Sequence, residues 1–387
     1  MRGGNIVSVR MYDCGFGDCF CIMDEYVDRP LFVDFGVNTF SKVGKKTLTY
    51  MKVLQDMQQL VNEGGMDFLL THYHTDHFSG LMHLIRNRER CVALSCIRFE
   101  NVYIPNVWNI ANSREVVMAL LLSYLPRHGK RKMNIIDFLM AICQTGGCVH
   151  LINRGSVIGD ALIALWPPKD LTVENYFREI DGGGEEFLTR LSDIADRLIN
   201  IVHTLILNQE NRTYTDALFH LKTLRTRFYE LCQTAPHIDE NTEIRLNTFG
   251  NEISIVFQNI HKEAGERNIL FTGDVHSKAW NDMETLQLQD GIFLHEQYGV
   301  IKVPHHGTET YYHDFGEYIP DSQEIKFLIP NGDMKKFGHK ISSHYPNSLR
   351  GAFVCCSNNN NCEEETCCRR CTCDPYRVVS TSPSFLI

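Results

Sequence analysis

Three histidines and an aspartate fall within six consecutive positions, in the segment 72–77 with the sequence HYHTDH. The segment follows directly on the apolar run 67–71 (DFLLT), which is typical of a buried strand. Imidazole and carboxylate groups are suitable ligands for Zn²⁺, Mn²⁺ or iron. A polar loop that is rich in histidine by chance is the alternative, but the pattern HxHxDH is demanding and has counterparts downstream. We therefore predict a metal site at the end of this strand.

Two aspartates also stand at the ends of predicted strands. Asp34 follows the run 31–33, and Asp274 follows the run 269–271. A carboxylate in such a place can hold the ring of a ligating histidine, which is the role expected of Asp34. A short carboxylate on a rigid strand can bridge two cations, which is the role expected of Asp274. Taken singly, each aspartate is weak evidence, because aspartate near a glycine turn is common.

Further histidines follow the later strands. His305 and His306 end the run 299–303 and precede a glycine, so they are candidates for ligands or acid–base groups. His344 lies beyond the next strand, and His339 competes with it in the same segment.

The elements that must position these residues alternate along the chain. The predicted strands are 6–12, 19–23, 31–33, 67–71, 101–105, 252–257, 268–271, 299–303 and 325–329, with a helix over about 45–60. Two largely helical stretches, about 113–142 and 171–231, interrupt this pattern as a lid, a partner surface or plain covering helices. Two β-rich halves that each carry ligands at strand ends predict one site between two sheets.

The composition is that of a globular protein, with 387 residues, 43% of them hydrophobic, and a formal net charge of -9. That charge argues against a broad nucleic-acid-binding surface. The longest apolar stretch, near 116–122, is too short to span a bilayer, and the first residues lack the apolar core of a signal peptide. We expect a cytoplasmic protein with no membrane association.

Seven of the fifteen cysteines lie in the short segment 355–373. They could fold around a structural Zn²⁺, or they could be reducible thiols in an asparagine-rich loop; the spacing leaves both interpretations open. The candidate zinc ligands are Cys356, Cys362, Cys367, Cys368, Cys371 and Cys373.

The order of these motifs resembles that of the metallo-β-lactamase superfamily, and more narrowly the soluble metallohydrolase domain of the competence protein ComEC and its stand-alone relatives. The matching segments are 13–19 (DCGFGDC), 32–36 (FVDFG), 72–77, 251–254 (NEIS), 272–274 (TGD), 302–307 (KVPHHG) and 344–346 (HYP). The resemblance implies an α+β fold, an αββα sandwich with a site for two divalent cations, Zn or Mn. The domain would span 1–354, with helical insertions at about 108–145 and 171–236 and a cysteine-rich segment at 355–387.

The resemblance also implies how the ligands divide. His72 and His74 would hold one cation, Asp76, His77 and His305 the other, and Asp274 would bridge, with His306 as the alternative to His305. Many members supply one more histidine to the first cation, and His150 is the best-placed candidate here, although its surroundings do not match. Binding of a single metal therefore remains open.

The activity implied is a phosphodiesterase or nuclease that uses a metal-activated hydroxide. Asp76 would orient the water, and His344 or His306 would protonate the leaving group. The acidic net charge favours a nucleotide or short single strand over long duplex DNA. The alternatives are an ester or lactone hydrolase, a di-iron oxidoreductase, which His74 disfavours, and a non-catalytic sensor or scaffold with a protein partner on the helical insertions. A role in antiviral defence is suggested by the resemblance alone.

Overall fold

The structure is a computed structural model that describes most of the chain. The described residues are 8–12, 14, 17–23, 27–37, 45–88, 92–125, 133–171, 184–207, 214–260, 268–318, 326–330, 342, 344, 353–356 and 376–380.

Two mixed sheets of seven strands each form the centre of the molecule. The first has the order β14-β1-β2-β3-β4-β5-β6, antiparallel from β14 to β3 and parallel from β3 to β6. Its strands are β1 (Ser8–Tyr12), β2 (Cys19–Met23), β3 (Leu31–Phe35), β4 (Asp67–Leu69), β5 (Asn101–Pro105), β6 (Cys148–Ile152) and β14 (Tyr376–Ser380).

The second sheet has the order β13-β12-β11-β10-β9-β8-β7, parallel from β13 to β10 and antiparallel from β10 to β7. Its strands are β7 (Val157–Ile158), β8 (Leu162–Trp166), β9 (Val256–Asn259), β10 (Ile269–Phe271), β11 (Val300–Lys302), β12 (Lys326–Ile329) and β13 (Phe353–Cys356).

The two sheets pack face to face through a shared apolar core. Phe20 of β2 meets Phe271 of β10 edge-on at 5.4 Å, and Phe271 stacks on Phe257 of β9 at 5.0 Å between ring centroids. Along β3, Leu31 points into this core while Phe32 points to the opposite face, as the two-residue period of a strand requires. Because both faces of the strand are covered, its sequence is apolar at every position except Asp34.

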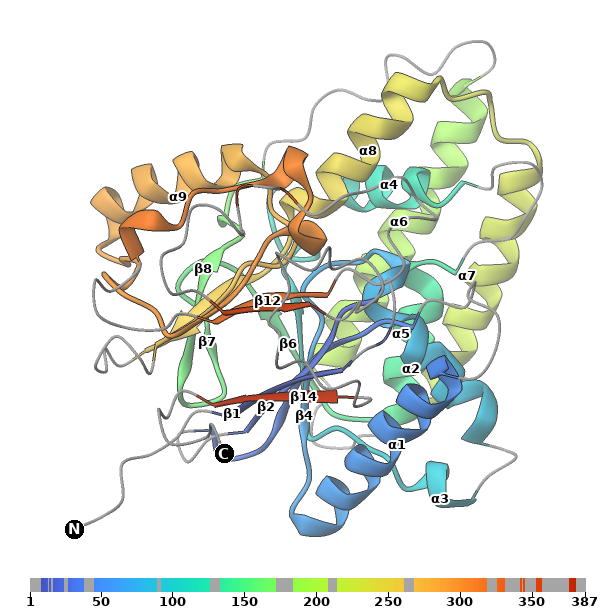
Figure 1. Ribbon diagram of the computed structural model, residues 1–387. Coiled ribbons are helices and arrows are strands. Elements are labelled where there is room, and N and C mark those ends of the chain that lie inside the picture. The colour runs from blue at the N-terminus through green and yellow to red at the C-terminus, as the bar shows by residue number, and fades with distance from the viewer. Residues whose placement is uncertain are drawn as a thin grey trace.

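Helices cover the outer face of each sheet (Figure 1). The helices that share an apolar core with the outer face of the first sheet are α1 (Lys45–Glu63), α2 (Thr75–Arg88), α3 (Val92–Ser95), α4 (Ser113–Ser123), α5 (Ile135–Thr145), α6 (Gly184–Leu207), α7 (Thr215–Gln233) and α8 (Glu240–Glu252). On the second sheet lie α9 (Ser277–Asp290) and short 3₁₀ turns η4 (His305–Gly307), η5 (Glu309–Tyr311) and η6 (Gly316–Tyr318). The chain is thus a mixed α/β protein, in agreement with the α+β prediction at this level.

The two predicted helical stretches contain α4 with α5 and α6 with α7, so their helical character is confirmed. The strand predicted at 252–257 is wrong at its start, because residues up to Glu252 belong to α8 and β9 begins at Val256. The polar sequence of α8 has few apolar positions, and its beginning is marked only by Asp239, whose side chain accepts a hydrogen bond from the Thr242 amide. The helices α2 and α9 were also not predicted.

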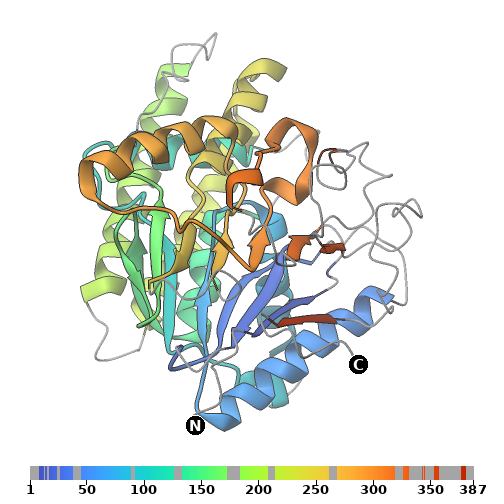
Figure 2. The same ribbon diagram turned by 60° about the vertical axis from the view of Figure 1, so that its left-hand side comes forward.

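The segment after residue 352 contributes an edge strand to each sheet. β13 pairs with β12, and β14 pairs with β1. In both views β14 (red) lies beside the blue strands of the N-terminal region (Figures 1 and 2). Five of the candidate zinc ligands lie outside the described residues, and Cys356 is placed only as part of β13, so the structural zinc stays a prediction. The five are Cys362, Cys367, Cys368, Cys371 and Cys373.

Among the described residues, no helix has both the length and the apolar character needed to cross a membrane.

Truncating a side chain in the core between the two sheets should cause a large loss of stability. Phe257→Ala removes a ring that is 0% exposed, so we expect the free energy of unfolding to fall by about 3–5 kcal/mol in urea denaturation. The control Phe293→Ala, at a side chain that is 53% exposed, should change it by less than about 0.5 kcal/mol. Equal losses in both variants would contradict the placement of the core between the sheets.

Candidate metal centre

The predicted ligands meet where the carboxyl ends of β3, β4, β10 and β11 come together. The backbone joins the two sheets at this point, since the Ile255 amide donates to the Thr71 carbonyl at 2.8 Å. Asp34 ends β3, the segment 72–77 follows β4, and Asp274 follows β10. Parallel strands place their carboxyl ends at one edge, which is why residues far apart in the sequence become neighbours.

Four donor atoms form the most complete group, which we call the second donor set. It consists of Asp76 Oδ2, His77 Nε2, Asp274 Oδ2 and His306 Nε2. His306 Nε2 lies 3.3 Å from the Asp76 oxygen and 4.0 Å from the Asp274 oxygen. His77 Nε2 lies 3.4 Å from Asp274 and 3.9 Å from Asp76. Ligands about 2.0–2.2 Å from a tetrahedral Zn²⁺ are about 3.4 Å apart, so this spacing fits one divalent cation.

The first donor set is smaller. His72 Nε2 lies 3.1 Å from His74 Nδ1 and 3.9 Å from Asp274 Oδ2, so the Asp274 oxygen belongs to both sets. The candidate fourth donor, His150, is elsewhere: its Nε2 is 3.0 Å from Asn101 Oδ1, and its ring stacks on Tyr103. The first donor set therefore offers three donors from the described residues.

The second ring nitrogen of two histidines is already occupied. Asp34 accepts a hydrogen bond from His77 Nδ1 at 2.7 Å and two more from the amide and hydroxyl of Thr71. His306 Nδ1 donates to the Pro330 carbonyl at 2.7 Å. Both contacts turn Nε2 toward the donor set, as the partners of metal-bound histidines do. His77 Nε2 is buried and makes no hydrogen bond of good geometry, which is the state of an atom shaped to hold a metal.

Backbone strain is concentrated here. Among the described residues, Asp34, His305 and His306 are the non-glycine residues with positive φ, at 57°, 39° and 56°. Such conformations cost about 1–3 kcal/mol each and persist where the surroundings impose them, which is characteristic of functional sites.

Two glycines allow the loops to approach closely. A Cβ on Gly250 would lie 2.5 Å from His74 Nε2, and one on Gly36 would lie 1.3 Å from the Asp76 carbonyl oxygen. A side chain at either position would displace a candidate ligand.

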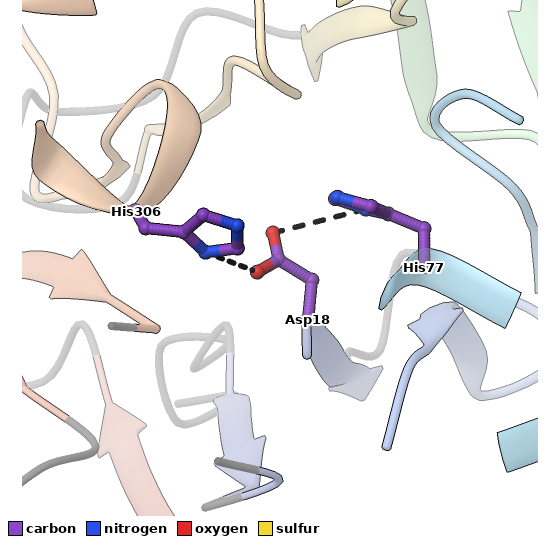
Figure 3. Close-up of side chains that lie close together, drawn as sticks. All are labelled: Asp18, His77 and His306. Atoms are coloured by element: carbon purple, nitrogen blue, oxygen red, sulfur yellow. Dashed lines mark ion pairs between the residues drawn. The ribbon is translucent and has the colours of Figure 1, made fainter. Parts of the chain in front are cut away.

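Asp18 and Lys302 complete the cluster, and neither was predicted as a site residue. Figure 3 shows the Asp18 carboxylate between the rings of His77 and His306. Lys302 Nζ lies 2.8 Å from Asp18 Oδ2 and 2.9 Å from Asp274 Oδ1, and it donates to the Gly273 carbonyl. Asp18 lies in the matching segment 13–19 and Lys302 in the segment 302–307. A single carboxylate or amine in such a segment does not indicate a role by itself.

The carboxylates of Asp18, Asp76 and Asp274 are matched in number by Lys302 and two protonated histidines, and Asp34 adds a further carboxylate 2.7 Å from His77 Nδ1. Burial alone would raise the pKa values of Asp18, Asp76 and Asp274. Lys302 and the neighbouring imidazoles hold those of Asp18 and Asp274 below their usual range, and imidazoles alone do so for Asp76. Although burial opposes it, the nearby carboxylates raise the pKa of His77 and bring that of His306 to about 10. If a divalent cation replaced the two protons on His77 and His306, the net charge of the cluster would stay the same.

His72 and His74 differ from that pair, because burial lowers the pKa of both rings. They are neutral near pH 7 and can serve as ligands without losing a proton.

Two predicted residues lie apart from the donor sets. His305 Nδ1 lies within hydrogen-bond distance of Thr308 Oγ1, at 3.0 Å, and the ring stacks on Tyr311 at 4.0 Å between centroids. Burial lowers the pKa of His305 to about 4. His306, predicted as the alternative, is the one beside Asp76. His344 is exposed at the surface, where its Nε2 lies 3.3 Å from Glu309 Oε1; His339 lies outside the described residues.

No protein-family model matches this sequence, and no curated protein matches it. The case for a metal centre accordingly depends on the arrangement of histidine and aspartate. Two buried groups, Asp18 with His77 and His306, and His72 with His77 and Asp274, each have donor atoms within 4.8 Å of one another and could hold a metal ion.

Proton release should accompany metal binding. Near pH 7 the second donor set must lose about two protons for each cation bound, so apparent affinity should rise with pH until about pH 10, where His306 loses its proton unaided. Isothermal titration calorimetry with Mn²⁺ in buffers of different ionisation enthalpy measures the proton count. His306→Gln should release about one proton fewer, whereas His305→Gln should release the same number as the native protein. A proton count near zero in the native protein would contradict this charge exchange.

Proposed function

We propose that this protein is a metal-dependent hydrolase of the metallo-β-lactamase superfamily, most similar to the ComEC-like members, that cleaves phosphodiesters. The observation that carries the proposal is the second donor set, in which the buried atoms His77 Nε2 and His306 Nε2 each lie 3.3–4.0 Å from an oxygen of Asp76 and an oxygen of Asp274. A first donor set shares Asp274 with it, which supports a centre for two divalent cations, Zn or Mn.

The arrangement of layers supports the superfamily assignment. Two sheets face each other with helices on both outer faces, and the donor sets lie at the ends of strands from both sheets. An αββα sandwich with its site along one edge is what the resemblance implies.

Each cation would have its own protein ligands. His72, His74 and Asp274 would hold the first, and the second donor set would hold the other. A bound divalent cation supplies Lewis acidity and lowers the pKa of coordinated water toward neutrality.

Asp76 is the donor that meets solvent. Its side chain is 27% exposed, whereas those of His72, His77 and His306 are 0% exposed. Its depressed pKa keeps it an acceptor near pH 7, so it can hold and orient an attacking water molecule by hydrogen bonding. The rings behind it are shielded from water and fix its position.

Proton donation to the leaving group falls to an imidazole near the surface. His344 is exposed, and its Nε2 lies 3.3 Å from Glu309 Oε1. His306 is the other candidate, but it is fully buried and belongs to the second donor set.

The choice of a phosphodiester follows the ComEC-like order of motifs, and the net charge of -9 favours a nucleotide or a short single strand over long duplex DNA.

The test is metal content by mass spectrometry together with turnover of bis(p-nitrophenyl) phosphate, cyclic nucleotides, single-stranded DNA and a lactone. Asp76→Asn should lower kcat on the phosphodiester by about 100-fold or more in a protein that still unfolds cooperatively, because the water loses its acceptor. The control Asp193→Asn, at an exposed aspartate of α6, should keep full activity.

Full activity of Asp76→Asn would refute the hydrolase proposal. Turnover of the lactone alone would replace the phosphodiester by an ester substrate. A metal-free protein with no turnover would favour the sensor or scaffold interpretation.

A further inference from the structure

Tyr73 separates the two histidines of the first donor set, and its side chain points away from them. The ring is 1% exposed and lies in the helical core, edge-on to Trp108 at 6.0 Å and to Phe138 at 6.0 Å. The rings of His72 and His74, by contrast, lie 4.7 Å apart at the donor set. One residue therefore faces the helices while its two neighbours face the candidate cation.

The side-chain hydroxyl and the backbone carbonyl of Tyr73 both form hydrogen bonds with residues outside the histidine loop. The hydroxyl donates to the Pro105 carbonyl at 3.0 Å and accepts from Trp108 Nε1 at 2.8 Å. The backbone carbonyl of Tyr73 accepts from the hydroxyl of Tyr124, which follows α4. The peptide unit between the two histidines is thus held from the helical side.

The chain of hydrogen bonds continues into α6. His203 Nε2 lies 3.0 Å from the Trp108 carbonyl and donates to it. His203, Trp108 and Tyr73 hence connect a helix of the predicted insertion to the loop of the metal centre.

The two donor sets are supported in different ways, and in the first His72 Nδ1 lies 3.2 Å from Thr71 Oγ1. Asp34 fixes His77 through its ring nitrogen, and the first turn of α2 fixes Asp76 and His77 relative to each other. His72 and His74 have three donors in total with Asp274, and their nitrogens are 3.1 Å apart, so a small rotation of the intervening peptide changes their separation directly.

We propose that Tyr73 is a positioning residue through which α6 and the Trp108 segment set the affinity of the His72–His74 pair for its cation. The inference rests on the metal centre proposed above. It adds that the helical insertion helps to position the metal ligands, besides covering the sheet.

The experiment measures metal stoichiometry and affinity directly, by equilibrium dialysis against Mn²⁺ with mass-spectrometric detection. His72→Ala first identifies the cation that depends on the first donor set. Tyr73→Phe should weaken binding of that same cation by about 10–100-fold and leave the other cation within about twofold. Trp108→Phe, which removes the indole donor together with part of a buried ring, should give a loss in the same direction.

The matched control is Tyr214→Phe, which removes another buried hydroxyl, one that donates to the Gly147 carbonyl at 2.8 Å. It should lower the melting temperature about as much as Tyr73→Phe without changing either metal affinity. The Mn²⁺ electron paramagnetic resonance signal of the first donor set should broaden in Tyr73→Phe and stay native in the control.

The outcomes separate the two proposals. Two cations bound by native protein, with equal affinities in Tyr73→Phe, would overturn the role of Tyr73 and leave the metal centre standing. A single cation that is insensitive to His72→Ala would overturn it as well. No cation bound by native protein would instead remove the metal centre on which the inference rests.

Discussion

The structure depends on the burial of opposite charges at one point between the sheets. Asp18 and Asp274 are buried there beside Lys302 and two imidazoles, and Asp76 joins them with its side chain 27% exposed. Unpaired charges in such surroundings would cost several kcal/mol each, so every group must have its partner in place. Three features keep these groups in position. They are the left-handed backbone at the strand ends, the closely packed glycines and the contact of Asp34 with His77. Folding of both sheets is thereby coupled to the assembly of the cluster.

Much of the site was predictable because its chemistry is local. The segment 72–77 and the aspartates at strand ends carry their own spacing, and most strands of the two sheets follow from short apolar runs. Asp18 and Lys302 could not be found this way, since their meeting requires one strand from each sheet. Helix α8 was missed because its polar sequence has little periodicity and its packing on α4 is a tertiary effect.

The two donor sets differ in how they are built. The second uses a helix start, a strand end and a strained turn, and its histidines are held by a carboxylate and a carbonyl. The first relies on two neighbouring loop residues and a shared oxygen of Asp274, whose other oxygen is bound by Lys302. The ammonium therefore leaves one oxygen of Asp274 that could serve as a ligand in the proposed metal centre.

Strand β14 determines when the first sheet can be completed during folding. It pairs with β1, Ser8 with Ser380, so the sheet that carries the histidine loop is completed by residues synthesised long after its first strand. Contacts that close so large a loop form late and slowly. During synthesis on the ribosome, the exposed edge of β1 would remain a site for mispairing, and a chaperone that shields this edge would increase the yield of native protein.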